Sequence, residues 1–190
     1  MNKALRRVSV FAALMVLALL VNVTVNYAWR SAGLLSDPGN RRVVDAQFDA
    51  PRGSILVGTT AVAETVPVEG GRFSVQRNYS DGPLYAPVTG HYSYIYGRTG
   101  LEQTYNDELS GTGDSQLFRR ILGELSGTPA QGATIQTTLD PNAQQAASNA
   151  LGGRTGAVIA MDYTTGAILT WASTPGYDPN ELSSTDLEST

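Results

Sequence analysis

The side chains that could support catalysis are few in this chain of 190 residues, which has one lysine, Lys3, one histidine, His91, and no cysteine. Acyl transfer by a Ser-x-x-Lys nucleophile, with its Lys-Thr-Gly strand, needs lysines that do not occur after residue 3. A Ser-His-Asp triad would depend on His91, and no serine has the flanking glycines of a nucleophile elbow. One histidine without cysteine offers no zinc set. We therefore predict no catalytic, cofactor-binding or metal-binding residues, and we interpret His91 as structural.

An apolar stretch near the N-terminus is long enough to cross a membrane. Val8 to Val25 carries no charge over 18 positions, and as a helix it would extend roughly 27 Å, close to a hydrocarbon core of about 30 Å. Three basic residues and no acid precede it, namely Lys3, Arg6 and Arg7. This asymmetry predicts a cytoplasmic tail at 1–7, a single uncleaved signal-anchor at 8–29, and an extracytoplasmic location for the remainder.

A cleaved secretory signal peptide is the alternative interpretation of this stretch. It requires a shorter apolar region and a cleavage site of the small-x-small type. The bulky residues Tyr27 and Trp29 flank the obvious site at Ala28. The sequence therefore favours an anchor in the cell membrane.

Beyond the apolar stretch the chain is acidic. From Ser31 onward, 9 Arg and 17 Asp plus Glu give a net charge of −8. A surface of that sign does not bind nucleic acid by neutralising phosphates. We expect the membrane as a partner and no nucleic acid.

Residues 43–100 are rich in Val, Thr, Tyr and Gly and predict a β-rich domain. We expect short strands at 43–48, 54–57, 62–67, 72–78 and 91–96. The alternating residues Tyr92, Tyr94 and Tyr96 should share one strand face, and we expect packing there rather than glycan binding. Helical patterns follow after Gly100 and again at 116–125, where the second is an amphipathic helix ending before Gly127.

The last third has clear local signals for a strand, a helix and a hairpin. A strand is expected at 134–139, and Asp140 followed by proline predicts a helix N-terminus. The apolar stripe expected on that helix consists of Ala143, Ala146, Ala147, Ala150 and Leu151. The runs 156–161 and 167–173, joined by a short turn, predict a β-hairpin. Asp178 before proline predicts another capped turn or helix.

Several motifs in this order resemble the class B penicillin-binding proteins, in the style of the actinobacterial penicillin-binding protein A group. Arg52-Gly53-Ser54-Ile55 is similar to the motif that opens the family's pedestal, and Gly100-Leu101-Glu102 to a later pedestal motif. The segments around Asp140, Gly166 and Pro175–Asn180 resemble the entry and first hairpin of its transpeptidase domain. The structural motif residues are Arg52, Gly53, Ile55, Gly100, Glu102, Asp140, Gly166, Asp178 and Asn180.

The resemblance implies an α+β fold with one N-terminal transmembrane helix, a β-rich, dimerisation-like pedestal at 36–132, and the first helix and β-hairpin of a transpeptidase domain at 133–190. It implies a full-length parent that is a serine-type peptidoglycan D,D-transpeptidase acting in the cell wall during division or shape maintenance. The family's catalytic serine and lysine lie downstream of this hairpin. We therefore interpret the chain as an N-terminal fragment, which meets peptidoglycan precursors and β-lactams only through its missing part.

A non-catalytic, membrane-anchored scaffold that docks cell-division or elongation proteins is the alternative function. The hairpin at 156–173 favours the enzyme, because a pedestal used only for docking does not need it.

The motif residues Arg52 and Glu102 suggest an ion pair that fixes the pedestal against the catalytic domain. If the pair is buried, loss of one partner would cost about 3–5 kcal/mol. An exposed pair would contribute less than about 1 kcal/mol.

Overall fold

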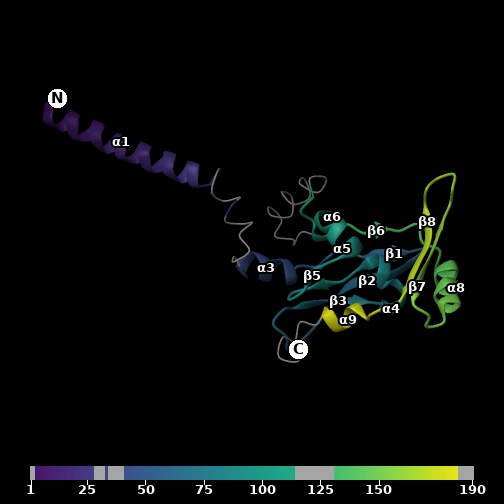
Figure 1. Ribbon diagram of the computed structural model, residues 1–190. Helices are drawn as coiled ribbons and strands as arrows, with labels where there is room; N and C mark the ends of the chain where they lie inside the picture. The colour runs from purple at the N-terminus through teal and green to yellow at the C-terminus, as the bar shows by residue number, and fades with distance from the viewer. Residues whose placement is uncertain (1–2, 28–32, 34–40, 114–130, 184–190) are drawn as a thin grey trace. The chain divides into compact units, whose positions relative to one another are not determined.

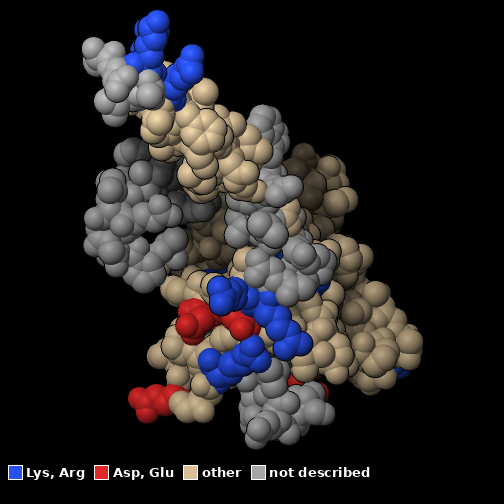
Figure 2. All heavy atoms as spheres, turned by 90° about the vertical axis from the view of Figure 1, so that its left-hand side faces the viewer, with Lys and Arg blue, Asp and Glu red and all other residues tan. Residues whose placement is uncertain are grey.

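The computed structural model describes residues 3–27, 33, 41–113 and 131–183. The chain divides into two units, Met1–Asp45 and Ala46–Thr190. The first contains α1 (Lys3–Val25), in which Arg6–Val25 has a mean hydropathy of 2.5 and is long and apolar enough to cross a membrane. Figure 2 shows basic side chains at one end of this helix and none along the flank in view. The apolar helix that the sequence predicts is confirmed, while Trp29 lies outside the described residues.

The segment predicted as a first strand, 43–48, is instead the helix α3 (Arg41–Phe48). Its paired β-branched residues, Val43 and Val44, favoured a strand in the sequence. Helical spacing places Val44 and Phe48 four residues apart on one face, and both are half-buried. Packing of Phe48 against other aromatic rings therefore outweighs local propensity.

The second unit is built on a four-stranded sheet with the order β3-β2-β1-β6 (Figure 1). Its strands are β1 (Ile55–Val57), β2 (Thr60–Pro67), β3 (Val75–Tyr79) and β6 (Ile135–Gln136). The first three pair antiparallel, whereas β6 runs parallel to β1 with Ile55 opposite Ile135. The predicted strands at 54–57, 62–67 and 72–78 are confirmed with shifted ends, and only the middle of 134–139 is a strand. The pedestal boundary at 132 stays a prediction; β6, just beyond it, belongs to this sheet.

Three short helices pack beside the sheet, namely α4 (Gly82–Thr89), α5 (Gly100–Thr104) and α6 (Asn106–Ser110). One core contains side chains from the sheet, α4, α6 and the chain after β6, and its buried residues are Ile55, Val57, Val62, Ala63, Tyr79, Tyr85, Leu109 and Leu139. The helical pattern after Gly100 is thus confirmed. The helix expected at 116–125 lies outside the described residues.

The strand expected at 91–96 is wrong beyond Ser93. The chain forms only β4 (Tyr92–Ser93) and β5 (Gly97–Arg98) around a turn, in which the Ser93 hydroxyl accepts the N–H groups of Ile95 and Tyr96. These hydrogen bonds stabilise a turn at residues 94–96 in place of an extended strand. Tyr92 and Tyr94 consequently pack against Phe48, while Tyr96 is 59% exposed and does not share their environment.

The last part of the unit is α8 (Pro141–Leu151), the hairpin β7 (Gly156–Met161) and β8 (Ile168–Thr174), and α9 (Pro179–Leu182). Figure 1 shows α8 lying along the hairpin. The Asp140 carboxylate accepts the N–H of Ala143 at 2.8 Å, which confirms the predicted N-cap. The predicted stripe is only partly right, because Ala146 and Ala150 are exposed and the buried residues are Gln144, Ala147 and Leu151. The α+β class and the hairpin are confirmed.

Candidate functional site

A buried ion network lies at the centre of the sheet-and-helix unit. Arg52 Nε donates to Glu102 Oε2 at 2.6 Å, and Arg77 Nε donates to Glu102 Oε1 at 2.7 Å. Glu102 is fully buried, and the two arginines are 7% and 4% exposed. The predicted pair of Arg52 and Glu102 is confirmed as a buried contact. Arg77 was not predicted; the strand alternation that puts it on one face with Tyr79 is the signal that could have found it.

Three of the four terminal guanidinium nitrogens of Arg52 and Arg77 donate to backbone or amide oxygens. Arg52 Nη2 donates to the Glu102 carbonyl at 2.7 Å and Nη1 to Asn106 Oδ1 at 3.0 Å, while Arg77 Nη1 donates to the Gly53 carbonyl at 2.8 Å. These bonds make the buried charges more tolerable, and among the described residues the buried Arg77 Nη2 has no hydrogen-bond partner. All these partners precede residue 113, within the predicted pedestal. The expectation that the pair lies between the pedestal and the catalytic domain is therefore wrong: the network joins parts of the pedestal to each other.

An aromatic ring extends this network toward α3. The Tyr92 ring stacks on Phe48 with centroids 4.2 Å apart and an interplanar angle of 11°. The Arg52 guanidinium lies 4.3 Å from the Tyr92 centroid, a favourable cation–π contact at a buried site. Burial raises the pKa of the Tyr92 hydroxyl. Phe48, at the end of α3, is thereby linked to the ion network through Tyr92.

Two motif glycines permit close backbone contacts around the network. Gly53 donates its N–H to the Leu109 carbonyl at 2.8 Å, and a Cβ there would collide with the Ala133 carbonyl. Gly100 opens α5 at φ +58°, and a Cβ there would lie 2.7 Å from the Val88 carbonyl oxygen. Ile55, the other residue of the first motif, is fully buried in the core.

Asn180 clamps the backbone of Tyr79. The N–H of Tyr79 donates to Asn180 Oδ1 at 2.8 Å, and Asn180 Nδ2 donates to the Tyr79 carbonyl at 2.9 Å. Asp178 Oδ1 accepts both the backbone N–H and Nδ2 of Asn180 at 2.9 Å, which caps α9 and orients the carboxamide. The cap predicted at Asp178 is confirmed, and the structure brings Asn180 to β3 across 101 residues of sequence.

Tyr79 contacts the ion network with its side chain. Its hydroxyl donates to Glu102 Oε1 at 3.3 Å. Burial, followed by the nearby Glu102 charge, raises the pKa of Tyr79 well above its ordinary value. The phenol therefore remains a protonated donor, and Tyr79 joins Glu102 on one side to Asn180 on the other.

Gln144 is a second carboxamide that joins separate elements. Its Nε2 donates to the carbonyls of Leu84 in α4 and Trp171 in β8, each at 2.9 Å. Its Oε1 accepts the Thr170 hydroxyl at 2.7 Å and the Trp171 N–H at 2.8 Å. All four hydrogen-bonding positions of this fully buried side chain are thus occupied. The apolar stripe predicted for α8 did not anticipate this role.

The motif glycine Gly166 closes the hairpin turn at φ +76°, with its N–H on the Asp162 carbonyl at 2.8 Å. His91, interpreted as structural, has Nδ1 3.2 Å from the Tyr177 hydroxyl and 3.1 Å from Thr99 Oγ1. Burial lowers the pKa of His91. The described contacts of both residues are those of a turn and of side-chain packing.

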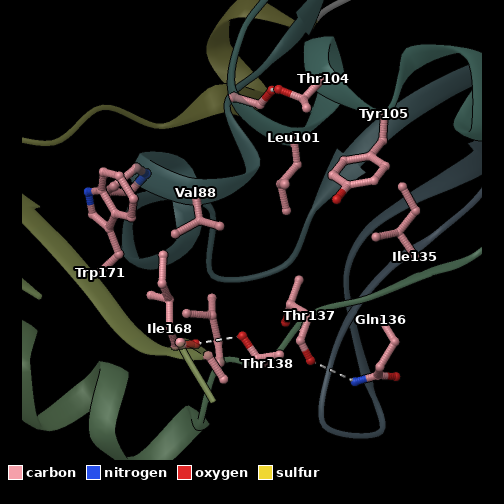
Figure 3. A pocket seen from close by; sticks show the side chains of 15 residues that line it. Val88, Leu101, Thr104, Tyr105, Ile135, Gln136, Thr137, Thr138, Ile168 and Trp171 are labelled. Atoms are coloured by element: carbon pink, nitrogen blue, oxygen red, sulfur yellow. Dashed lines mark hydrogen bonds between the residues drawn. The ribbon is translucent and has the colours of Figure 1, made fainter. Parts of the chain in front are cut away.

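A cavity of about 590 Å³ lies between α4, α5, β6 and the hairpin. Figure 3 shows Val88 and Leu101 facing Ile168 and Thr137 across it. No carboxylate, imidazole or amine occurs among the described residues that line it. In the part of the chain that the structure describes, no three His, Asp or Glu side chains gather to hold a metal ion. In the described residues, the buried polar side chains join separate elements of the fold to each other.

Comparison with known proteins shows what this chain is similar to. Residues 52–135 match the family model of the penicillin binding protein A dimerisation domain. The chain is 38% identical over 192 residues to peptidoglycan D,D-transpeptidase PbpA of Mycolicibacterium smegmatis, which covers 98% of this chain and 39% of that protein. It is 39% identical over 194 residues to PbpA of Mycobacterium tuberculosis, which covers 99% of this chain and 39% of that protein.

Solved structures agree with the sequence matches. Penicillin-binding protein A from M. tuberculosis, as its ceftriaxone acyl-enzyme complex, superposes with a TM-score of 0.71 at 35% identity and covers 76% of this chain and 33% of that chain. The chain thus spans about two fifths of the length of the curated relatives it matches (39%). The resemblance stated from the motifs is confirmed: residues 52–135 match the penicillin-binding protein A dimerisation domain, and the chain is similar to PbpA over nearly its whole length.

Proposed function

We propose that this chain is the membrane anchor, pedestal and transpeptidase-domain entry of a peptidoglycan D,D-transpeptidase. The observation that carries the proposal is its match over 98% of its length to PbpA, a peptidoglycan D,D-transpeptidase. The nucleophilic serine and its lysine would follow in the longer polypeptide. In this arrangement the chain would position the catalytic domain and would not contribute catalytic residues. Its α8, hairpin and α9 are bonded to the pedestal through Gln144 and Asn180.

The proposed enzyme would act outside the cytoplasm on peptidoglycan precursors and would be acylated by β-lactams. Its N-terminus would remain in the cytoplasm, because Lys3, Arg6 and Arg7 precede the apolar helix. The pedestal would be the surface available to cell-division or elongation proteins.

Penicillin labelling in cells that natively make the protein tests this function. Membranes are treated with a fluorescent penicillin and resolved on a gel, which is then probed with an antibody against residues 72–113. We expect a labelled, antibody-positive band far heavier than the 20.1 kDa of this chain. An unlabelled band at that mass would instead support the non-catalytic scaffold.

Orientation in the membrane can be tested by expressing these 190 residues with single introduced cysteines, because the 190 residues contain none. A membrane-impermeant maleimide applied to intact cells should label Gln103→Cys, at an exposed position in α5, and leave Asn2→Cys unlabelled. Both variants should react after permeabilisation, which serves as the control. Labelling of Asn2→Cys in intact cells would contradict the proposed orientation.

A further inference from the structure

We infer that Tyr79, Gly82 and Asn180 form an interlock through which the pedestal sets the orientation of the transpeptidase domain for acylation. The inference rests on the proposed function and assigns these three residues to positioning, because their described contacts join the pedestal to α9. Asn180 belongs to α9, which follows the hairpin directly, whereas Tyr79 and Gly82 belong to the pedestal.

The first element of the interlock is the edge of the pedestal sheet. β3 is at one end of the strand order, and Asn180 pairs with both the N–H and the C=O of Tyr79 at 2.8 and 2.9 Å. The carboxamide thus takes the place of an opposing residue in a neighbouring antiparallel strand, whose C=O and N–H would make the same two bonds. Two bonds to the backbone of one residue fix direction as well as distance.

The second element is the close approach of α9 to the start of α4. A Cβ at Gly82 would lie 2.5 Å from Asp178 Oδ1 and 2.9 Å from Pro179 Cδ. Pro179 is fully buried in this contact region, and Asp178 is the residue that orients the Asn180 carboxamide. A single methyl group at position 82 would therefore push α9 away from the pedestal without removing any bonding side chain.

The third element is the ion network behind Tyr79. The Tyr79 hydroxyl donates to Glu102, whose carboxylate is held by Arg52 and Arg77. Tyr79, whose backbone is bonded to Asn180 of α9, is thus itself held by a side-chain hydrogen bond in the pedestal core. This rigidity is what a positioning contact needs, because an anchor that moves cannot set an orientation.

Orientation matters for rate because acyl transfer depends on the placement of the reacting atoms. A displacement of about 1 Å caused far from the chemistry can lower a rate by about 10²-fold. α9 begins five residues after β8 ends, so a shift of α9 changes the direction in which the chain continues from the first hairpin. The effect should appear in the acylation step rather than in initial binding of a β-lactam.

The test uses full-length protein and stopped-flow acylation by a fluorescent penicillin, which separates the noncovalent dissociation constant from the acylation rate constant. We expect Gly82→Ala and Asn180→Ala to lower the acylation rate constant by about 10-fold and to leave the dissociation constant unchanged. Asn180→Asp should give a loss at least as large as Asn180→Ala, because a carboxylate oxygen in the place of Nδ2 would face two acceptors, the Tyr79 carbonyl and the Asp178 carboxylate.

Gly113→Ala is the matched control, since its Cβ would meet only ordinary contacts, the nearest at 3.5 Å. Hydrogen exchange at the amide of Ser183, which donates to Pro179 in α9, reports whether α9 has loosened. Faster exchange with an unchanged acylation rate would overturn the inference while leaving the proposed function intact. Absence of penicillin uptake by the unmodified full-length protein would overturn the proposed function and the inference together.

Discussion

The pedestal and the segment that follows it are held by different kinds of polar contact. In the pedestal, one carboxylate and two guanidinium groups are buried together around Glu102. In the segment from α8 to α9, two neutral carboxamides, Gln144 and Asn180, bond to backbone groups of other elements. Each arrangement joins positions that are far apart in sequence.

The difference has consequences for how each region should respond to mutation. Burying a charged side chain is costly unless an opposite charge lies beside it. The loss of one charged residue of the ion network therefore leaves its partners buried without compensation. A satisfied carboxamide carries no net charge, and its loss leaves only unpaired dipoles behind. The ion network should therefore be the more sensitive of the two to a single isosteric substitution.

The largest expected effect is that of Glu102→Gln. The substitution leaves Arg52 and Arg77 buried without a counter-charge, and one amide N–H₂ group faces a guanidinium that can only donate. We expect the free energy of unfolding to fall by about 3–5 kcal/mol. Urea unfolding of the detergent-solubilised protein measures it.

Glu69→Gln is the control for this change, because Glu69 is exposed. It should alter the free energy of unfolding by less than about 0.5 kcal/mol. Equal stabilities of the Glu102→Gln variant and the unmodified protein would show that the network contributes no net stabilisation, and would remove the contrast between the two regions.

A smaller effect is expected for Gln144→Leu. The leucine has a similar size but leaves the Trp171 N–H, the Leu84 carbonyl and the Thr170 hydroxyl without this partner. We expect a loss of about 2 kcal/mol in the free energy of unfolding, measured in the same way.

Gln145→Leu provides the neighbouring control, since Gln145 is exposed and bonds only locally to Asn149. It should leave stability nearly unchanged. A loss for Gln144→Leu as large as that for Glu102→Gln would mean that net charge does not decide the sensitivity of the two regions.

The sequence predicted those features that depend on local signals. Asp140 and Asp178, each before proline, start helices as expected, and the hairpin follows from two apolar runs around a short turn. The motif resemblance also paired Arg52 with Glu102 correctly.

The features that the sequence did not predict depend on distant partners. Strand alternation places Arg77 on one face with Tyr79, but it does not identify the carboxylate that Arg77 binds, which lies 25 residues away. Gln144 lies on a face where alanine predicted apolar packing, and its partners lie up to 60 residues away. The helix at 41–48 is favoured by the stacking of Phe48 on Tyr92. Local strand propensity could not predict it, because Tyr92 is distant in the sequence.

The smallest effect should come from a charged group that is exposed, Asp162 in the hairpin turn. Hydrogen bonds from the Thr164 hydroxyl and N–H, and from the Thr165 hydroxyl, lower the pKa of Asp162 from 3.8 to about 2. Because the folded pKa is depressed, the associated stabilisation is present above pH 3.8 and disappears as the pH falls through about 2.

An NMR titration of the Asp162 carboxyl carbon should therefore have its midpoint near pH 2. Thr164→Ala should raise this midpoint toward 3.8, and Thr165→Ala should raise it less, because the Thr164 hydroxyl lowers the pKa more than the Thr165 hydroxyl does and the backbone N–H of residue 164 remains in both variants. Neither substitution should affect the Glu102 network, since the hairpin turn contributes no bond to it. A midpoint near 3.8 in the unmodified protein would show that these turn bonds do not persist in solution, and the contrast would then be one of buried polar groups alone.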